Sequence, residues 1–179
     1  IEVRQRSHCY GYKLLKANSK YFHKSDGFIM ALKIGDQLPE FSLLDQSGKL
    51  RTHKEFRGKA LVLFFYPKDD TPGCTIEVCG FRDKYDLFKI LGARVCGVSN
   101  GGEESHLLFS NKHKLQYPLL CDEKNSLRKA FGVPKVLGML DGRVTYIFDS
   151  DGKVCHIFED LLNGPAHIKE AIRVLKEIQ

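Results

Sequence analysis

Two cysteines five residues apart, Cys74 and Cys79, are the residues of this sequence best suited to covalent chemistry. Pro72 suits the first position of a helix, because its missing N–H would be unpaired there anyway, and Thr71 before it is a natural N-cap. Cys74 then falls in the first helical turn, where free backbone N–H groups and the positive end of the helix dipole favour an anion. Because the thiolate is the reactive form of cysteine, we predict that Cys74 is a nucleophile.

The position of Cys74 alone leaves a second interpretation open, in which it is a small buried apolar residue. Asp69 and Asp70 precede it and would oppose thiolate formation if their carboxylates faced the sulfur. A nearby cation is therefore needed, and the spacing of residues does not say which one supplies it.

The five-residue spacing to Cys79 favours a transient disulfide. On an ideal helix it corresponds to about 7.5 Å of rise and about 8–9 Å between the Cα atoms. A disulfide needs Cα atoms within about 7 Å, so the pair can bridge only if the helix unwinds locally. Zinc sites use cysteines two to four residues apart with two further ligands, and thioredoxin-type motifs have two intervening residues. Neither pattern is present around Cys74.

The elements predicted around these cysteines alternate between strand and helix. We expect a short hairpin from 41–44 and 50–51, strands at 60–66, 93–99, 117–120, 144–148 and 154–158, helices at 72–91, 103–114, 126–131 and 168–178, and a loop at 135–141. The apolar run from Ala60 to Tyr66 is typical of a strand that is covered on both faces. This order predicts an α/β protein with a thioredoxin-like fold, a mixed central sheet flanked by helices with an extra N-terminal hairpin.

The charge of the chain is concentrated near its start. Residues 1–30 hold six basic and two acidic residues, whereas the remaining 22 basic and 20 acidic residues nearly balance. We therefore predict a basic, disordered extension at 1–29, a single domain at 30–179, and no nucleic-acid partner. No run of eighteen apolar residues is present, so no membrane span is expected.

The stretch from Pro67 to Asp83 resembles the signature of the peroxiredoxin Q branch of the peroxiredoxins, also called bacterioferritin comigratory protein. Pro67, Thr71 and Cys74 match Pro-x-x-x-Thr-x-x-Cys, and the longer string Thr-Pro-Gly-Cys-Thr-x-x-x-Cys-x-x-Arg-Asp ends at Asp83. The similarity covers about residues 31–179, continuing through 97–99, 131–133 and 142–146. A departure is Ala130-Phe131, where relatives often carry a tryptophan, and it bears on substrate preference.

This resemblance implies a thioredoxin-dependent peroxiredoxin that reduces hydrogen peroxide and alkyl hydroperoxides. Cys74 would attack the peroxide and become a sulfenic acid, and Cys79 would then close an intramolecular disulfide with it. Thr71 would hydrogen-bond the thiolate and the peroxide, and Pro67 would shield the thiol from water. Arg143 would supply the missing positive charge, lower the thiol pKa and polarise the peroxide.

The resemblance further implies that thioredoxin or a similar dithiol reduces the disulfide, that no metal, haem or other cofactor is needed, and that the protein is a monomer. A non-enzymatic redox sensor using the same two thiols remains the alternative. A dithiol oxidoreductase acting on proteins is disfavoured by Pro67 and Thr71. We expect a cytoplasmic location, since free cysteines in a chain with a full core indicate a reducing compartment, with the chloroplast as the alternative if 1–29 is the remnant of a transit peptide.

The remaining cysteines and histidines are predicted to have no part in the chemistry. We expect Cys96 and Cys155 in the core, Cys121 and Cys9 as spectators, and His106 and His113 exposed to solvent on a polar helix face. Arg82 is either a structural ion-pair partner or a residue of the site.

Overall fold

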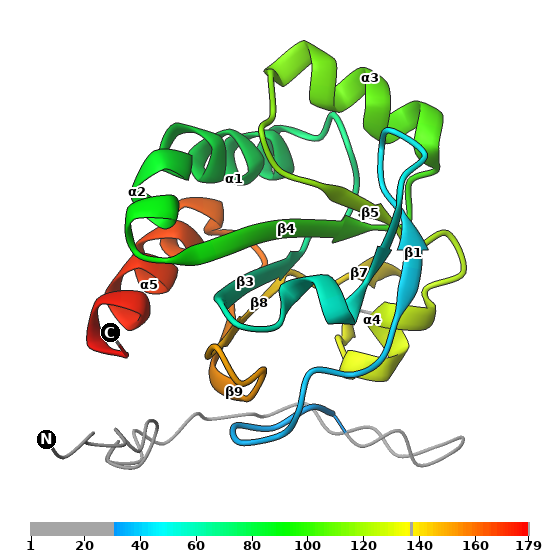
Figure 1. The fold of residues 1–179 in the computed structure, drawn as a ribbon. Coiled ribbons are helices and arrows are strands. Elements are labelled where there is room, and N and C mark those ends of the chain that lie inside the picture. Colours follow the sequence, from blue (N-terminus) through cyan, green and yellow to red (C-terminus); the bar gives the residue numbers. More distant parts are fainter. Residues whose placement is uncertain (1–30, 137, 179) are drawn as a thin grey trace, which may run out of the picture.

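A five-stranded mixed sheet forms the centre of the computed structural model, which describes residues 31–136 and 138–178 (Figure 1). The strand order is β5-β4-β3-β8-β9, with β3, β4 and β5 parallel to one another and β8 antiparallel to both β3 and β9. These strands span Ala60–Phe65 (β3), Ala93–Ser99 (β4), Leu119–Cys121 (β5), Val144–Phe148 (β8) and Val154–Glu159 (β9). The predicted mixed sheet flanked by helices is confirmed, and residues 1–29 lie outside the described part.

The central strand β3 is covered on both faces, as its unbroken apolar sequence predicts. Val62 and Phe64 face one side, where Phe64 stacks on Phe81 of the helix α1 (Pro72–Asp83) with ring centroids 4.3 Å apart. Leu63 and Phe65 face the other side and belong to a second apolar cluster with Phe131. Because successive side chains of the strand point to opposite faces, β3 contributes residues to two separate apolar cores.

The helices α1 (Pro72–Asp83), α2 (Tyr85–Ile90) and α5 (Gly164–Glu177) lie together against the sheet, and α3 (Glu103–His113) lies beside β5 (Figure 1). α5 approaches α1 closely at its first residue: a Cβ on Gly164 would lie 3.0 Å from the Cβ of Glu77. The backbone of α5 can reach this helix only because Gly164 has no side chain. The helix α4 (Ser126–Phe131) contributes to the second core.

The single helix predicted over 72–91 is wrong, because the chain breaks into α1 and α2 at Lys84. Lys84 has φ −106° and ψ 9°, outside the helical region, although the bonds from Lys84 N to Gly80 O and from Phe88 N to Lys84 O still bridge the break. The apolar period continues across the break, so the pattern of residues carries no signal for it. The bend leaves Phe88 fully buried in the first core.

Smaller differences concern element ends. The predicted loop at 135–141 contains a short antiparallel pair, β6 (Lys135–Val136) and β7 (Leu140–Asp141). The strand predicted at 117–120 begins two residues later, because Tyr117 instead turns inward and donates its hydroxyl to Val78 O at 2.7 Å. α5 starts four residues earlier than predicted, where the Asn163 side chain accepts from Ala166 N.

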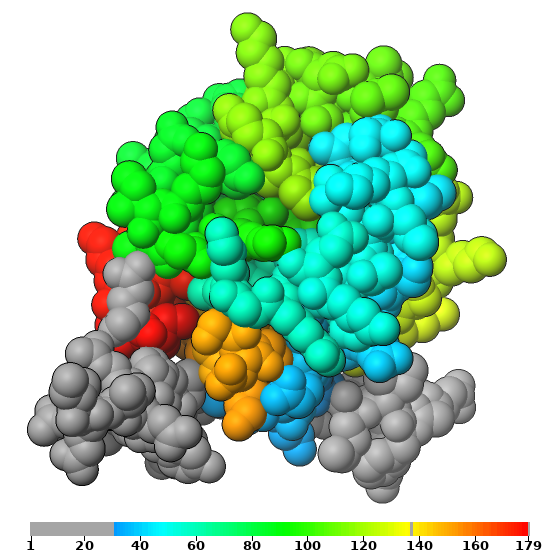
Figure 2. All heavy atoms as spheres, viewed as in Figure 1, coloured from blue at the N-terminus to red at the C-terminus, as the bar shows by residue number. Residues whose placement is uncertain are grey.

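The predicted N-terminal hairpin is confirmed as β1 (Ser42–Leu44) paired with β2 (Leu50–Thr52), followed by the 3-10 turn η1 (His53–Phe56). In Figure 2 the atoms of this segment, cyan to teal, form the middle and right of the viewed face, beside green atoms at the left. Among the described residues, no helix is long and apolar enough to cross a bilayer.

Candidate active site

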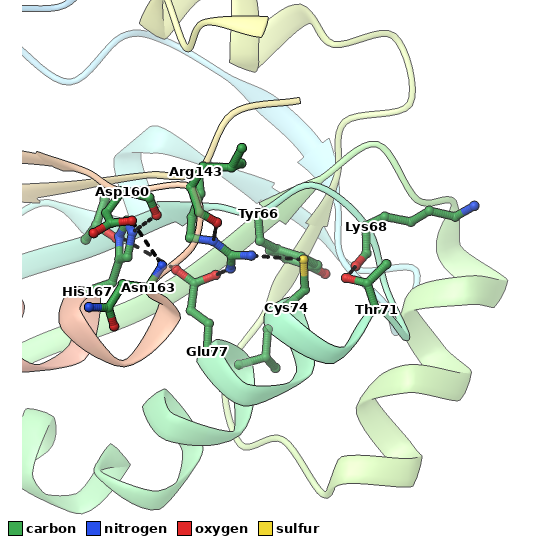
Figure 3. Close-up of polar contacts among 12 residues, drawn as sticks. Tyr66, Lys68, Thr71, Cys74, Glu77, Arg143, Asp160, Asn163 and His167 are labelled. Carbon is green, nitrogen blue, oxygen red and sulfur yellow. Dashed lines mark hydrogen bonds and ion pairs between the residues drawn. The ribbon is translucent and has the colours of Figure 1, made fainter. Parts of the chain in front are cut away.

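Cys74 is the third residue of α1 and follows directly from the loop that leaves β3. The residue is 1% exposed, and its sulfur points toward Arg143 (Figure 3). The first hydrogen bond within the helix joins Thr75 N to Thr71 O, so the backbone N–H groups of Gly73 and Cys74 are not used by the helix. The predicted position of Cys74 in the first turn is confirmed, and the unpaired N–H groups favour negative charge there.

Arg143 reaches the sulfur from the residue just before β8. Its Nη2 donates to Cys74 Sγ at 3.4 Å, its Nη1 pairs with the Glu77 carboxylate, and its Nε donates to Leu161 O at 3.0 Å (Figure 3). The guanidinium is 4% exposed, so water screens its charge little. Burial lowers the pKa of Arg143, but Glu77 and the Cys74 sulfur raise it more, so the group is a permanent cation beside the thiol.

Glu77 lies one helical turn beyond Cys74 and is fully buried. Burial raises the pKa of Glu77 to about 8 against the opposing effect of Arg143. Among the described residues its Oε1 has no hydrogen-bond partner, and it lies 3.7 Å from His167 Nδ1. When Glu77 is protonated it no longer neutralises Arg143, and the charge of that guanidinium then acts mainly on Cys74.

His167, on α5, stands behind Glu77. Its Nε2 lies 2.9 Å from the carbonyl oxygen of Asp160, which can only accept, so Nε2 carries the proton and Nδ1 accepts from Thr145 Oγ1 at 2.8 Å. Burial lowers the pKa of His167 to about 4. A neutral imidazole therefore closes the inner side of the site at pH 7, and its position was not predicted from the sequence.

Arg128 is a second buried arginine near the site, and sequence reasoning missed it. Its Nη2 donates to Tyr66 O at 2.9 Å and its Nη1 to Gly142 O at 2.8 Å. Tyr66 is followed by Pro67, and Gly142 by Arg143, so one side chain fixes the backbone on both sides of the sulfur. Burial lowers the pKa of Arg128, while acidic side chains and the Cys74 sulfur oppose this effect. The sequence carries no clear signal for this role, because α4 contains both Arg128 and Lys129 and only their contacts distinguish them.

Thr71 occupies the N-cap position of α1, as predicted, but its side chain makes no capping hydrogen bond. Its Oγ1 instead donates to Lys68 O at 3.2 Å, turning the hydroxyl toward the preceding loop (Figure 3). Pro67 begins that loop and is half-buried. The two residues therefore flank the segment that enters α1.

Asp69 anchors the same loop, and its carboxylate is held by three hydrogen-bonding partners, which reduces its repulsion of a thiolate at Cys74. Its carboxylate accepts from the Tyr66 hydroxyl and the Ser105 hydroxyl and pairs with His106 Nδ1, each at 2.7 Å. Burial raises the pKa of Asp69, but these partners lower it below its usual value. His106, predicted to be exposed, is 0% exposed. The prediction failed because Gly101 has no side chain: a Cβ there would lie 2.7 Å from Cε1 of the ring, so the loop before α3 can pack directly on His106.

Cys79 lies in the second turn of α1, half-buried, and both cysteines are free thiols on an intact helix. Its Sγ lies 3.5 Å from Nδ1 of His113, which was also predicted to be exposed and is half-buried. Arg82 pairs with Asp83 and donates to His113 O at 2.8 Å, so it joins α1 to α3 and does not contact Cys74.

The other described cysteines contact neither Cys74 nor Cys79. Cys96 is fully buried, as predicted, and burial raises its pKa. Burial raises the pKa of Cys121 to about 12. Cys155 is half-buried on β9, so its predicted core position is wrong. Cys9 lies outside the described residues.

Residues 34–157 match the AhpC/TSA family. The chain belongs to this family. Among curated relatives of this peroxiredoxin, it is 41% identical over 165 residues to "Peroxiredoxin Q, chloroplastic" of Sedum lineare, covering 92% of the chain and 88% of the relative. It is 46% identical over 143 residues to the protein of the same name in Arabidopsis thaliana, covering 79% and 66%.

Solved structures agree with this membership. Peroxidoxin BcpB of Mycobacterium tuberculosis matches this peroxiredoxin with a TM-score of 0.76 and 34% identity, over 83% of this chain and 99% of that one. A cysteine-to-serine mutant of PrxQ from Xylella fastidiosa matches with a TM-score of 0.77 and 29% identity, over 83% and 98%. The predicted thioredoxin-like fold and peroxiredoxin Q branch are confirmed. The protein is a thiol-dependent peroxidase, with peroxides as substrates and a thiol as reductant.

Proposed function

We propose that Cys74 is the peroxide-reactive cysteine of this peroxidase. The observation that carries the proposal is the 3.4 Å contact from Arg143 Nη2 to a sulfur that is 1% exposed and lies at a helix N-terminus. In a buried site, a fixed cation and unpaired N–H groups stabilise a thiolate far more than they would in water.

The thiolate of Cys74 attacks one peroxide oxygen, so an S–O bond forms while the O–O bond breaks. The displaced oxygen takes a proton and leaves as water or an alcohol, and Cys74 becomes a sulfenic acid. Arg143 offers N–H groups to the charge that develops on the leaving oxygen. Thr71 Oγ1 donates to Lys68 O, which leaves its lone pairs available to accept a hydrogen bond from the peroxide. Pro67 limits the access of water to the sulfur.

Cys79 then forms a disulfide with Cys74. Both residues lie in α1, so the first turns of this helix must unwind before the two sulfurs meet. We propose thioredoxin or a similar dithiol as the reductant of the exposed disulfide. A disulfide within one chain requires no second subunit, which supports a monomer.

We propose the chloroplast as the compartment of the protein, with the cytoplasm as the alternative. The Sedum lineare and Arabidopsis thaliana relatives are named chloroplastic, and this favours the chloroplast over the cytoplasm that the cysteine usage first suggested.

Intact-mass analysis after one equivalent of hydrogen peroxide tests the assignment of the two cysteines. We expect a loss of two hydrogen atoms, located by digestion to a peptide pair linking Cys74 and Cys79. Cys74→Ser should abolish peroxide consumption, and Cys79→Ser should complete one turnover and stop as a sulfenic acid. Cys155→Ser, which changes another half-buried cysteine, should behave as wild type.

Two outcomes would contradict the proposal. Normal cycling of Cys79→Ser with thioredoxin would remove Cys79 from the reaction. A wild-type protein that forms the disulfide but does not turn over peroxide in the steady state with any dithiol would favour the alternative of a redox sensor.

A further inference from the structure

His113 contacts the thiol of Cys79 at a place that the peroxide chemistry at Cys74 does not use. Its Nδ1 lies 3.5 Å from Cys79 Sγ, within hydrogen-bonding distance for sulfur. The ring also packs edge-on against Phe109, with centroids 4.8 Å apart. The contact joins α3 to the second turn of α1.

The direction of this hydrogen bond follows from the state of the thiol. Burial raises the pKa of Cys79, so the sulfur keeps its proton near neutral pH and has an S–H to donate. In the tautomer that carries the ring proton on Nε2, Nδ1 of His113 accepts this S–H. Nε2 is buried and has no hydrogen-bond partner in the described part of the chain, so the thiol is the polar group toward which this ring is directed.

Contacts with α1 fix the position of the His113 ring. Arg82 Nη1 donates to the carbonyl oxygen of His113 at 2.8 Å and so ties the end of α3 to α1. The titratable or charged groups that act on the Cys79 sulfur are Arg82 and Asp83 of α1 and the Tyr117 hydroxyl. Arg82 favours the thiolate, whereas Asp83 disfavours it. Within the described residues, no carboxylate is hydrogen-bonded to the ring to serve as a competing base.

We propose that His113 accepts the thiol proton of Cys79 and so prepares this cysteine for disulfide formation. The proposal rests on the proposed role of Cys79 as the disulfide partner. A thiol whose pKa is raised ionises little at pH 7, yet only the thiolate attacks. Histidine is the side chain that most often acts as a general base, so His113 supplies the base that the Cys79 thiol lacks.

The reaction balances without a further reagent. The S–H proton of Cys79 passes to Nδ1 of His113, and the thiolate attacks the sulfur of the Cys74 sulfenic acid. The S–S bond forms as the S–O bond breaks, and the leaving hydroxide becomes water with one proton, which His113 gives up directly or through solvent, so that the imidazole is neutral again. Cys79 contacts His113 in the helical form of α1, so the proton can be transferred before the first turns of α1 separate.

His113→Phe tests the proposal, since it keeps an aromatic ring beside Phe109 but removes the base. Because the chain has no tryptophan, the reaction is followed by rapid quenching with a thiol-alkylating reagent and mass analysis. Oxidation of Cys74 should proceed at the wild-type rate. Disulfide formation at pH 7 should slow by about tenfold or more, the lower range of general-base effects. The defect should shrink as the pH rises, because Cys79 then ionises without help.

A second variant guards against a packing effect. His113→Gln can still accept the S–H hydrogen bond but is not a base, and it should show the same defect and the same recovery at high pH. His156→Gln, which changes another half-buried histidine on β9, should leave both steps unchanged.

Three outcomes decide the matter. Wild-type rates of disulfide formation in both His113 variants would overturn the proposal. A defect of equal size at every pH would overturn it too, because loss of packing does not depend on thiol ionisation. If the wild-type disulfide does not link Cys74 and Cys79, the proposed function fails and this inference fails with it, whereas a correct disulfide with unaffected variants removes only the role of His113.

Discussion

Arg143 Nη2 lies 3.4 Å from Cys74 Sγ, although 69 residues separate the two along the chain. The sheet explains this contact. β8 is the antiparallel neighbour of β3, and Val144 at the start of β8 is paired with Phe65 at the end of β3. The residue before β8 and the helix after β3 therefore meet at the same edge of the sheet, which brings a cation to the thiol.

Replacing Arg143 should slow the reaction of Cys74 with peroxide. Arg143→Met removes a charged hydrogen bond worth about 1.5–3 kcal/mol, which corresponds to a loss of about 10–100-fold in the second-order rate constant. Arg143→Lys keeps the charge but cannot contact both Glu77 and Cys74 with a planar fork, so its rate should be intermediate. Competition with a peroxidase of known rate measures both. Equal second-order rate constants for Arg143→Met and the wild type would show that the charge of Arg143 does not act on the Cys74 thiolate.

Arg128 should matter for stability as well as for rate. Arg128→Met leaves the carbonyl oxygens of Tyr66 and Gly142 without their buried donor, and each unpaired group costs about 1–3 kcal/mol. We expect urea unfolding of the reduced protein to reveal a loss of at least about 2 kcal/mol, together with a slower reaction at Cys74. The neighbouring exposed Lys129→Met is the matched control and should change neither. A stable Arg128→Met variant with a wild-type rate would contradict the role of Arg128 as a clamp.

Glu77 should make the fold less stable as the pH rises. Its pKa is about 8 in the fold and near 4.5 when unfolded, so the folded state holds a proton that the unfolded state has lost. Stability is therefore highest below about pH 4.5, falls between the two values, and reaches its lower level above pH 8. Glu77→Gln cannot ionise, so its unfolding free energy relative to wild type should improve from pH 5 to pH 9.

One pKa unit corresponds to about 1.4 kcal/mol, so the relative gain for Glu77→Gln should exceed about 1 kcal/mol over this range. Urea unfolding at pH 5, 7 and 9 measures it, with the exposed Glu104→Gln as a control expected to follow wild type. A constant difference between Glu77→Gln and wild type at all three pH values would mean that Glu77 is ionised throughout.

The local pattern of residues predicted the sheet and the position of Cys74 well, because strand burial and helix starts depend on neighbours in sequence. The apolar run of β3 and the Thr-Pro pair before Cys74 are such local signals. The break at Lys84 was not predictable in this way, since the apolar period runs through it and only packing of Phe88 against the sheet reveals the bend.

The buried polar groups of the site were harder to predict from the sequence than the strands and helices. His106 and His113 lie on a helix with polar neighbours, and their burial comes from Asp69 and Cys79 on other elements. Arg128 likewise takes its partners from two distant loops. Contacts of this kind depend on how elements meet, and no periodicity along one element records them.

Oxidation of the protein should unwind the first part of α1. The helix spans Pro72–Asp83 in the reduced state and holds both cysteines, whose Cα atoms on an ideal helix are about 8–9 Å apart, too far for a disulfide. Cys74 and Val78 are buried in the first core, so unwinding also withdraws apolar contacts. Hydrogen exchange should accordingly rise in peptides covering 72–80 once the disulfide forms.

The strand β4 supplies an internal reference for this measurement, because peptides covering Ala93–Ser99 lie in the central sheet and should keep their protection. Cys79→Ser treated with one equivalent of peroxide is the matched control, since it reaches the sulfenic acid without a disulfide and should retain a protected α1. Faster exchange in this variant would attribute the unwinding to oxidation of Cys74 alone. An oxidised wild-type protein with unchanged protection over 72–80 would rule out a disulfide between these two cysteines.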